Sequence, residues 1–275
     1  MNRTASRAAL LTAAALIALL APTRLTAQEP GNVPETKAPT PVKAAPPAAQ
    51  AASAPVDDYS TKHNQQLLND FGWLAKFSPA NMKLAPPAPG ENRVVFMGDS
   101  ITEAWKIEGP DGTFPGKPYI NRGISGQTTP QMLVRFRQDV IALKPKVVVI
   151  LAGTNDIAGN TGPMTLEQTE DNLASMADLA AANGIKVVLC SVLPAFDYPW
   201  KRGLEPAPKI LAVNQWIKAQ ATEKGYVYVD FHTAMKDDRD GLPAALSYDG
   251  VHPTPAGYAM MAPLAEAGIQ KALRQ

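Results

Sequence analysis

The feature that most constrains the fold is a repeated alternation of short runs rich in β-branched residues with longer segments of helical character. Five such runs occur, at 93–97, 119–121, 147–151, 186–192 and 226–230. Two of them are continuously apolar, which is typical of parallel strands that are covered on both faces. The alternation therefore predicts an α/β fold, in which a parallel sheet lies between two layers of helices.

Start and stop signals define the helices between these runs. Thr129 and Pro130 form a helix start, and Pro145 stops that helix. A capping box begins the next helix at Thr165, and Gly184 ends it. The pattern predicts helices from Thr129 and Thr165, a third over 209–224, a last one from Thr254 to Leu273, and an extra N-terminal helix outside the sheet over 58–77.

Residues 1–27 have the pattern of a secretory signal. Arg3 and Arg7 precede an apolar stretch, 8–21, that is short for a membrane span of about 20 residues. Cleavage is expected after Ala27 or Ala21, and the alternative is an uncleaved anchor. Removal of this segment takes the formal charge from +1 to −2, because it contains three arginines and no acidic residue.

Residues 28–57 differ in composition from everything that follows. They contain seven prolines, eight alanines and no aromatic residue, and three valines are their only large apolar side chains. Such a segment buries too little apolar surface to offset the entropy of ordering it. We expect a disordered linker over 28–57 and a single organised domain over 58–275.

Composition also narrows the function classes. A formal charge of +1 argues against nucleic acid as the main partner, since nucleic-acid binding usually shows as a strong basic excess. Cys190 is the single cysteine, which excludes an intramolecular disulfide or a cysteine-rich zinc site. The acidic run 237–241 lacks the alternation of oxygen ligands in a calcium loop and is interpreted as a solvated turn. No metal or organic cofactor is expected.

Polar groups follow four of the predicted strands. Since ligands bind beyond the carboxyl ends of strands in open α/β sheets, these groups are expected to meet at one edge. They are Ser100 after the first strand, Gly123 after the second, Asn155 after the third, and Asp249 with His252 after the fifth.

These residue types fit nucleophilic catalysis. A serine hydroxyl attacks a carbonyl only when a base removes its proton, and histidine is suited to that at neutral pH. The histidine needs a carboxylate to orient it, and Asp249 precedes His252 by three residues. The oxyanion formed by the attack needs donors, for which the candidates are the N–H groups of Ser100 and Gly123 and the side-chain amide of Asn155.

Four sequence blocks carry a family resemblance: Gly98-Asp99-Ser100, Gly123, Gly153-x-Asn155-Asp156 and Asp249-x-x-His252. In this order they resemble the SGNH/GDSL hydrolases, over the chain from about residue 93 to the end. The resemblance implies a flavodoxin-like three-layer fold with a five-stranded parallel sheet. It also implies an ester-hydrolysing site with Ser100 as nucleophile, His252 as base, Asp249 as its partner, and Gly123 and Asn155 as oxyanion donors.

The segment 121–129 is most similar to the platelet-activating-factor acetylhydrolase-like branch, which implies a preference for short acyl groups, particularly acetyl. One departure is Ile101, where the family name has leucine. It changes only the shape of a side chain.

Substrate contacts are less defined. Candidates are Asp99, Arg122, Trp105, Tyr198 and Trp200, with Phe114 and Phe196 as further aromatics on the same loops and Lys201-Arg202 as further cations. The sequence leaves two roles open for these aromatic residues. Either they contact the substrate, by stacking on a sugar or lining an acyl pocket, or they pack the loops. We interpret His232 as structural, His63 as a surface residue on the N-terminal helix, and Cys190 as a core residue.

The sequence thus predicts a periplasmic or secreted serine esterase for short-chain esters of carbohydrate or cell-envelope substrates, acting through an acyl-enzyme. Three alternatives remain: a lysophospholipase or arylesterase with a longer acyl preference, a peptidoglycan O-acetylesterase, and a non-catalytic carbohydrate-binding module. No obvious lid is present, which argues against an interfacial lipase. The expected partners are small-molecule or polysaccharide esters, with no nucleic acid and no membrane span after cleavage. The oligomeric state is left open.

Overall fold

A five-stranded sheet forms the centre of the part of the chain that the structure describes. The computed structural model describes residues 58–275, so the predicted signal (1–27) and linker (28–57) lie outside the described residues. All neighbouring strands are parallel, in the order β2-β1-β3-β4-β5. The strands are β1 (Val94–Gly98), β2 (Tyr119–Gly123), β3 (Val147–Leu151), β4 (Lys186–Cys190) and β5 (Val227–Val229). The predicted parallel sheet is confirmed.

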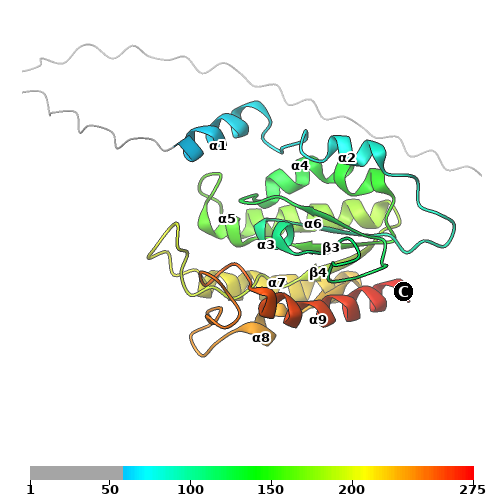
Figure 1. Cartoon of the computed structure of the whole chain (residues 1–275). Coiled ribbons are helices and arrows are strands. Elements are labelled where there is room, and N and C mark those ends of the chain that lie inside the picture. The colour runs from blue at the N-terminus through cyan, green and yellow to red at the C-terminus, as the bar shows by residue number, and fades with distance from the viewer. Residues whose placement is uncertain (1–57) are drawn as a thin grey trace, which may run out of the picture. The chain divides into compact units, whose positions relative to one another are not determined.

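Helices cover both faces of this sheet (Figure 1). Successive side chains of a strand point to opposite faces. Val95 and Met97 accordingly pack in one apolar cluster, and Val94 and Phe96 pack in another. The first cluster includes residues of α4 (Thr129–Asp139), α6 (Leu166–Ala182) and α7 (Ala207–Lys224), and the second includes residues of α9 (Pro255–Leu273). The three-layer α/β/α fold is therefore confirmed.

Two predicted helices end earlier than expected. The N-terminal one is α1 (Asp58–Asn69), followed by turns and by α2 (Ser78–Lys83). The carboxylate of Asp70 accepts the N–H groups of Leu74 and Ala75, at 2.8 and 2.9 Å, so it stabilises a turn in place of another helical turn. Similarly, α4 ends at Asp139, before the expected stop at Pro145. The 3-10 turn η1 (Ile141–Leu143) follows it.

Short helices follow three of the strands directly and place polar residues at the carboxyl edge of the sheet. They are α3 (Ser100–Ala104), α5 (Thr154–Ala158) and α8 (Phe231–Met235). At five residues each, they are too short for hydrophobic periodicity to reveal. Within residues 58–275, none of the helices combines the length and the apolar character that crossing a bilayer requires.

Candidate active site

Ser100 is the first residue of α3, immediately beyond β1. The carboxylate of Asp99 caps this helix and accepts the Ile101 N–H at 2.9 Å. The turn leaves no room for a side chain at Gly98, because a Cβ there would lie 2.7 Å from the carbonyl oxygen of Leu151. The absence of a side chain at Gly98 therefore lets β1, β3 and α3 approach closely, and Ser100 lies just beyond the carboxyl end of β1.

A continuous hydrogen-bonded chain joins Ser100 to two residues that are about 150 positions away. The Ser100 Oγ lies 2.9 Å from the His252 Nε2, and the His252 Nδ1 lies 2.7 Å from the Asp249 Oδ2. The three side chains that the sequence singled out as nucleophile, base and carboxylate are thus brought together. A neutral imidazole in this arrangement donates from Nδ1 to the carboxylate and accepts from the serine at Nε2.

The turn over 249–252 explains why a three-residue spacing brings the two side chains together. The other carboxylate oxygen of Asp249 accepts the backbone N–H groups of Val251 and His252, at 3.0 and 2.8 Å. Gly250 has φ +86°, a conformation that glycine adopts without strain. Burial alone would raise the pKa of Asp249, but these N–H groups and the imidazole lower its pKa below the ordinary value. The carboxylate is therefore ionised at neutral pH.

A pocket of about 430 Å³ opens above these groups. It is lined by residues of six separate segments: His63, Ser100, Ser125, Gly126, Asn155, Asn160, Trp200 and His252. None of these lining residues has an aliphatic side chain. The pocket thus contains the predicted serine, histidine and asparagine, together with residues that the sequence did not single out.

Gly123 is not placed as an oxyanion donor, so that expectation is wrong. Its backbone N–H donates to the side-chain oxygen of Asn121 at 2.8 Å, and Gly123 does not line the pocket that holds Ser100. The residue is the last one of β2 and packs against the backbone of Glu103 in α3, where a Cβ would lie 2.2 Å from the nitrogen atom of Glu103. Its small size serves this close approach of strand and helix.

Gly126 takes the place expected of Gly123. It lines the pocket, has φ +77°, and its backbone N–H donates to no acceptor among residues 58–275. The Asn155 Nδ2 donates one hydrogen to the carbonyl oxygen of Gln127 at 3.0 Å, which leaves its second hydrogen for the pocket. The N–H of Ser100, at the first position of a helix, is likewise unused within that helix. Ser100, Gly126 and Asn155 thus each bring a candidate donor to the pocket that holds the Ser100 hydroxyl.

Two of the aromatic side chains considered for substrate contact are buried instead. Trp105 is 2% exposed and packs against the rings of Phe96, Phe114 and Tyr258. Tyr198 is fully buried, and its hydroxyl lies 3.0 Å from the Thr154 Oγ1. These rings pack the loops, and neither lines the pocket that holds Ser100.

The charged side chains considered for substrate contact also interact with other parts of the protein. The Arg122 side chain is buried and donates to the Asn81 Oδ1 at 2.7 and 3.0 Å, and its guanidinium lies over the Phe77 ring. Asp99 is buried beneath α3. The ammonium group of Lys201 donates to the carbonyl oxygen of Ala158 at 2.6 Å. Arg122 and Asp99 are therefore structural, and the expectation that they contact substrate is wrong.

Trp200 does reach the pocket and is 44% exposed. Its ring stacks on the buried ring of Tyr198, with centroids 5.1 Å apart, and its Nε1 donates to the Asn160 Oδ1 at 3.2 Å. His63 contributes a second imidazole to the pocket wall from α1. No sequence signal separates His63 from an ordinary surface residue, because its place in the pocket depends on how α1 packs.

The other histidine and the cysteine lie in the interior. His232 is buried at the start of α8, and burial lowers the pKa of its imidazole. Cys190 is buried in β4, and burial raises the pKa of its thiol. Cys190 is thus a core residue, as the sequence predicts, and neither residue lines the pocket that holds Ser100. Among the described residues, no cluster of three histidine, cysteine or acidic side chains is arranged to hold a metal ion.

Asp99 makes the stability of the protein depend on pH. In the unfolded chain this carboxyl group ionises near pH 4, whereas burial raises its pKa to about 7 in the folded state. Between these values the folded chain retains a proton that the unfolded chain has released. The free energy of unfolding therefore falls as the pH rises through this range, before other groups are considered.

Replacement of Asp99 by asparagine is expected to remove this dependence, because the amide keeps an acceptor for Ile101 and cannot ionise. Relative to the wild type, the free energy of unfolding of Asp99→Asn should increase between pH 4 and pH 7, by up to about 1.4 kcal/mol per pH unit. Urea unfolding at pH 4.5, 6 and 8 measures this. A difference between the two proteins that is the same at all three pH values would contradict the burial argument.

Comparison with known proteins agrees with this geometry. Residues 96–260 match the GDSL-like lipase/acylhydrolase family. A GDSL-like lipase from Bacteroides thetaiotaomicron, whose structure is solved, is 47% identical, with 74% of this chain and 99% of that chain aligned at a TM-score of 0.70. Human platelet-activating factor acetylhydrolase IB subunit alpha2 is 27% identical over 217 residues, which cover 71% of this chain and 82% of that protein.

An acetylxylan esterase from Xylanibacter ruminicola is 30% identical over 247 residues. The aligned part is 76% of this chain and 48% of that protein, so the chain spans about half the length of this relative. The family match, in contrast, extends over more than half of the present chain and includes the end of the strand before Ser100 and the turn that holds His252. The chain therefore belongs to the GDSL-like lipase/acylhydrolase family, and its folded domain is that of a carboxylic ester hydrolase.

Proposed function

We propose that this protein is a serine esterase that removes short acyl groups, above all acetyl, from carbohydrate esters through an acyl-enzyme. The observation that carries this proposal is the hydrogen-bonded chain from Ser100 through His252 to Asp249. Such a chain serves to take a proton from a hydroxyl and return it to a leaving alcohol. The proposal needs no group beyond these side chains and water.

The acylation half begins when the Ser100 Oγ attacks the carbonyl carbon of the ester and its proton passes to the His252 Nε2. The ionised Asp249 stabilises the imidazolium that forms and holds its orientation. The carbonyl oxygen becomes an oxyanion, which accepts hydrogen bonds from the N–H groups of Ser100 and Gly126 and from the Asn155 side chain. When the carbon–oxygen bond to the alcohol breaks, His252 returns the proton to the leaving oxygen, and the acyl group stays on Ser100.

Deacylation repeats these steps with water as the nucleophile. His252 accepts a proton from the water as its oxygen attacks the acyl carbon, and the same three donors hold the second oxyanion. The bond to the Ser100 Oγ then breaks, and the proton on His252 passes to that oxygen. The products of this half are the free carboxylic acid and the regenerated enzyme. The whole cycle therefore consumes one ester and one water and yields one alcohol and one acid.

The pocket supports a short acyl group and a polar alcohol. Among the described residues that line it, none is aliphatic, so nothing there resembles a channel for a long acyl chain. Asn160, Ser125 and His63 offer polar contacts to hydroxyl groups, and Trp200 presents an exposed ring that the stack on Tyr198 holds in place. The likeness to an acetylxylan esterase supports a sugar as the alcohol half.

Hydrolysis of p-nitrophenyl esters from C2 to C12 tests the acyl preference, and we expect activity to fall steeply beyond about C4. Acetate release from acetylated xylan and from purified cell wall then compares the two classes of polymer. A rate that rises with chain length would instead support a lysophospholipase or arylesterase. Release from cell wall alone would support a peptidoglycan O-acetylesterase.

The ring of Trp200 is expected to bind the sugar. Trp200→Ala should raise the KM for acetylated xylo-oligosaccharides by about three- to tenfold, which corresponds to the free energy of one aromatic contact. The KM for p-nitrophenyl acetate should rise less. Phe196→Ala is the matched control, because Phe196 is an exposed aromatic residue of the same loop that does not line the pocket. Equal KM changes for the two variants would contradict this assignment.

The proposed location is the periplasm or the outside of the cell. It rests on the signal predicted over 1–27 and on the nature of the proposed substrates, which occur outside the cytoplasm. Expression of the full chain with mass analysis of the exported protein tests it. We expect a mature N-terminus after Ala27 or Ala21, and recovery of the uncleaved chain in the membrane fraction would support the anchor alternative.

A further inference from the structure

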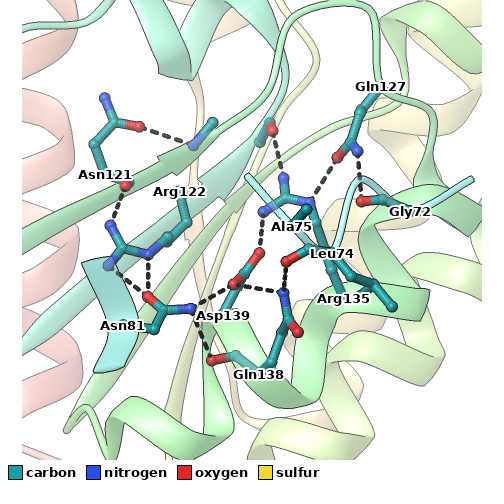
Figure 2. A network of polar contacts seen from close by, with 12 residues as sticks. Gly72, Leu74, Ala75, Asn81, Asn121, Arg122, Gln127, Arg135, Gln138 and Asp139 are labelled. Atoms are coloured by element: carbon teal, nitrogen blue, oxygen red, sulfur yellow. Dashed lines mark hydrogen bonds and ion pairs between the residues drawn. The ribbon is translucent and has the colours of Figure 1, made fainter. Parts of the chain in front are cut away.

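A buried arginine links the end of β1, just before Ser100, to the loop that carries Gly126. Arg135 lies in α4 and is fully buried. Its Nη2 donates to the carbonyl oxygen of Gly98 at 3.1 Å, and its Nε donates to the side-chain oxygen of Gln127 at 2.6 Å. Figure 2 shows this guanidinium at the centre of a network that also contains Asp139. One rigid group thus contacts both segments.

Both contacts lie next to the proposed reacting groups. Gly98 ends β1, two residues before Ser100, and its carbonyl oxygen also accepts the N–H of Ile124 at 3.1 Å. Gln127 directly follows Gly126, and its backbone oxygen accepts the Asn155 side chain at 3.0 Å. The guanidinium therefore contacts one residue that lies two positions before Ser100, and another that follows Gly126 and accepts the Asn155 side chain.

The network also fixes the charge of Arg135. The Nη1 of Arg135 donates to the Asp139 carboxylate at 3.2 Å, and both side chains are fully buried. Asn81 donates to the same carboxylate at 2.7 Å. Burial lowers the pKa of Arg135 to about 10, so the group remains charged at neutral pH. Because desolvating two charges offsets much of their attraction, an ion pair of this kind is weak support for a role in stability alone.

We propose that Arg135 is a positioning residue that sets the distance between the Ser100 nucleophile and the donors Gly126 and Asn155. This inference rests on the proposed esterase function and deepens it. Arg135 does not line the pocket, so it acts through Gly98 and Gln127. The planar fork of a guanidinium donates in several fixed directions, whereas a lysine ammonium is a compact charge on a flexible stem. Positioning therefore requires arginine, while neutralising Asp139 requires only a cation.

Arg135→Lys separates these two roles, because it keeps the cation beside Asp139 and removes the fork. We expect the kcat for p-nitrophenyl acetate, per active site titrated with a phosphonate, to fall by about 10- to 100-fold, the effect of a small misplacement of reacting groups. The KM should change less than the kcat. The rate constant for phosphonate inactivation should fall with the kcat, because it depends on the same donors.

Arg137→Lys is the matched control, since Arg137 is an exposed arginine of the same helix, and it should match the wild type. If Arg135→Lys does not fold, Gln127→Leu decides by the same two measurements, because it removes the contact between the guanidinium and the loop that carries Gly126. A variant with fewer titrated sites but an unchanged kcat per site would show a merely structural role and overturn the proposal. Failure of the proposed function is a separate result, namely full activity in Ser100→Ala.

Discussion

Replacing Ser100 by alanine is expected to lower the kcat for p-nitrophenyl acetate by about 10⁴-fold or more, which is the scale reached when the nucleophile of a catalytic triad is removed. The hydroxyl lies 2.9 Å from the His252 Nε2, and without it no acyl-enzyme forms. Initial rates and the burst of p-nitrophenol in the first turnover both measure this. The variant should lose the burst as well as the steady-state rate.

The double variant with His252→Ala tests whether the two residues act as one unit. Because removal of either residue disables the same step, the double variant should be no slower than the slower single variant by more than about twofold. Unfolding curves control for loss of structure, since Ser100 is a surface-accessible residue of the pocket. If Ser100→Ala keeps a rate near that of the wild type, then the nucleophile is wrongly assigned.

Replacing Asn155 by alanine is expected to lower the kcat by about 10²- to 10³-fold, the effect of losing one oxyanion donor. The Asn155 amide already donates one hydrogen to Gln127, and its oxygen accepts the Asn160 side chain at 2.9 Å. These bonds hold the remaining hydrogen toward the pocket. Since that hydrogen bond strengthens only as charge develops on the oxygen, kcat and kcat/KM should fall together while the KM changes little.

Asn183→Ala provides the control, because Asn183 is an exposed asparagine at the end of α6. It should leave both constants unchanged. A rise in the KM without a fall in the kcat for Asn155→Ala would mean that Asn155 binds the ground state, and the oxyanion donors would then have to be sought elsewhere in the pocket.

The architecture could be predicted because it depends on local patterns. The uninterrupted apolar run in β3 requires cover on both faces. The capping box at Thr165 marks the start of α6, and the glycine at 225 marks the end of α7. Prediction was poorer at Asp70, where a side chain bonds to the backbone four and five residues later and ends a helix. Such a contact competes with the helical pattern and leaves no periodic signal.

The proposed triad could also be predicted, but the set of oxyanion donors could not. Ser100, Asp249 and His252 are identified by residue type and by their places after strands. The choice between Gly123 and Gly126 depends on which backbone N–H is already bonded, and Asn121 takes that of Gly123. Likewise Trp105 and Trp200 look alike in sequence, yet one lies inside an aromatic cluster and the other is at the rim of the pocket.

The order of apolar and polar residues along this chain thus specifies a parallel sheet and the edge at which a serine, a histidine and an aspartate meet, since strand direction alone brings those ends together. Side-chain packing across the sheet and between loops specifies the rest. It places Gly126 in the pocket wall, buries Arg122 and Trp105, and brings His63 from a separate helix into the same wall. Those outcomes depend on contacts between distant segments, for which no short stretch of sequence carries a signal.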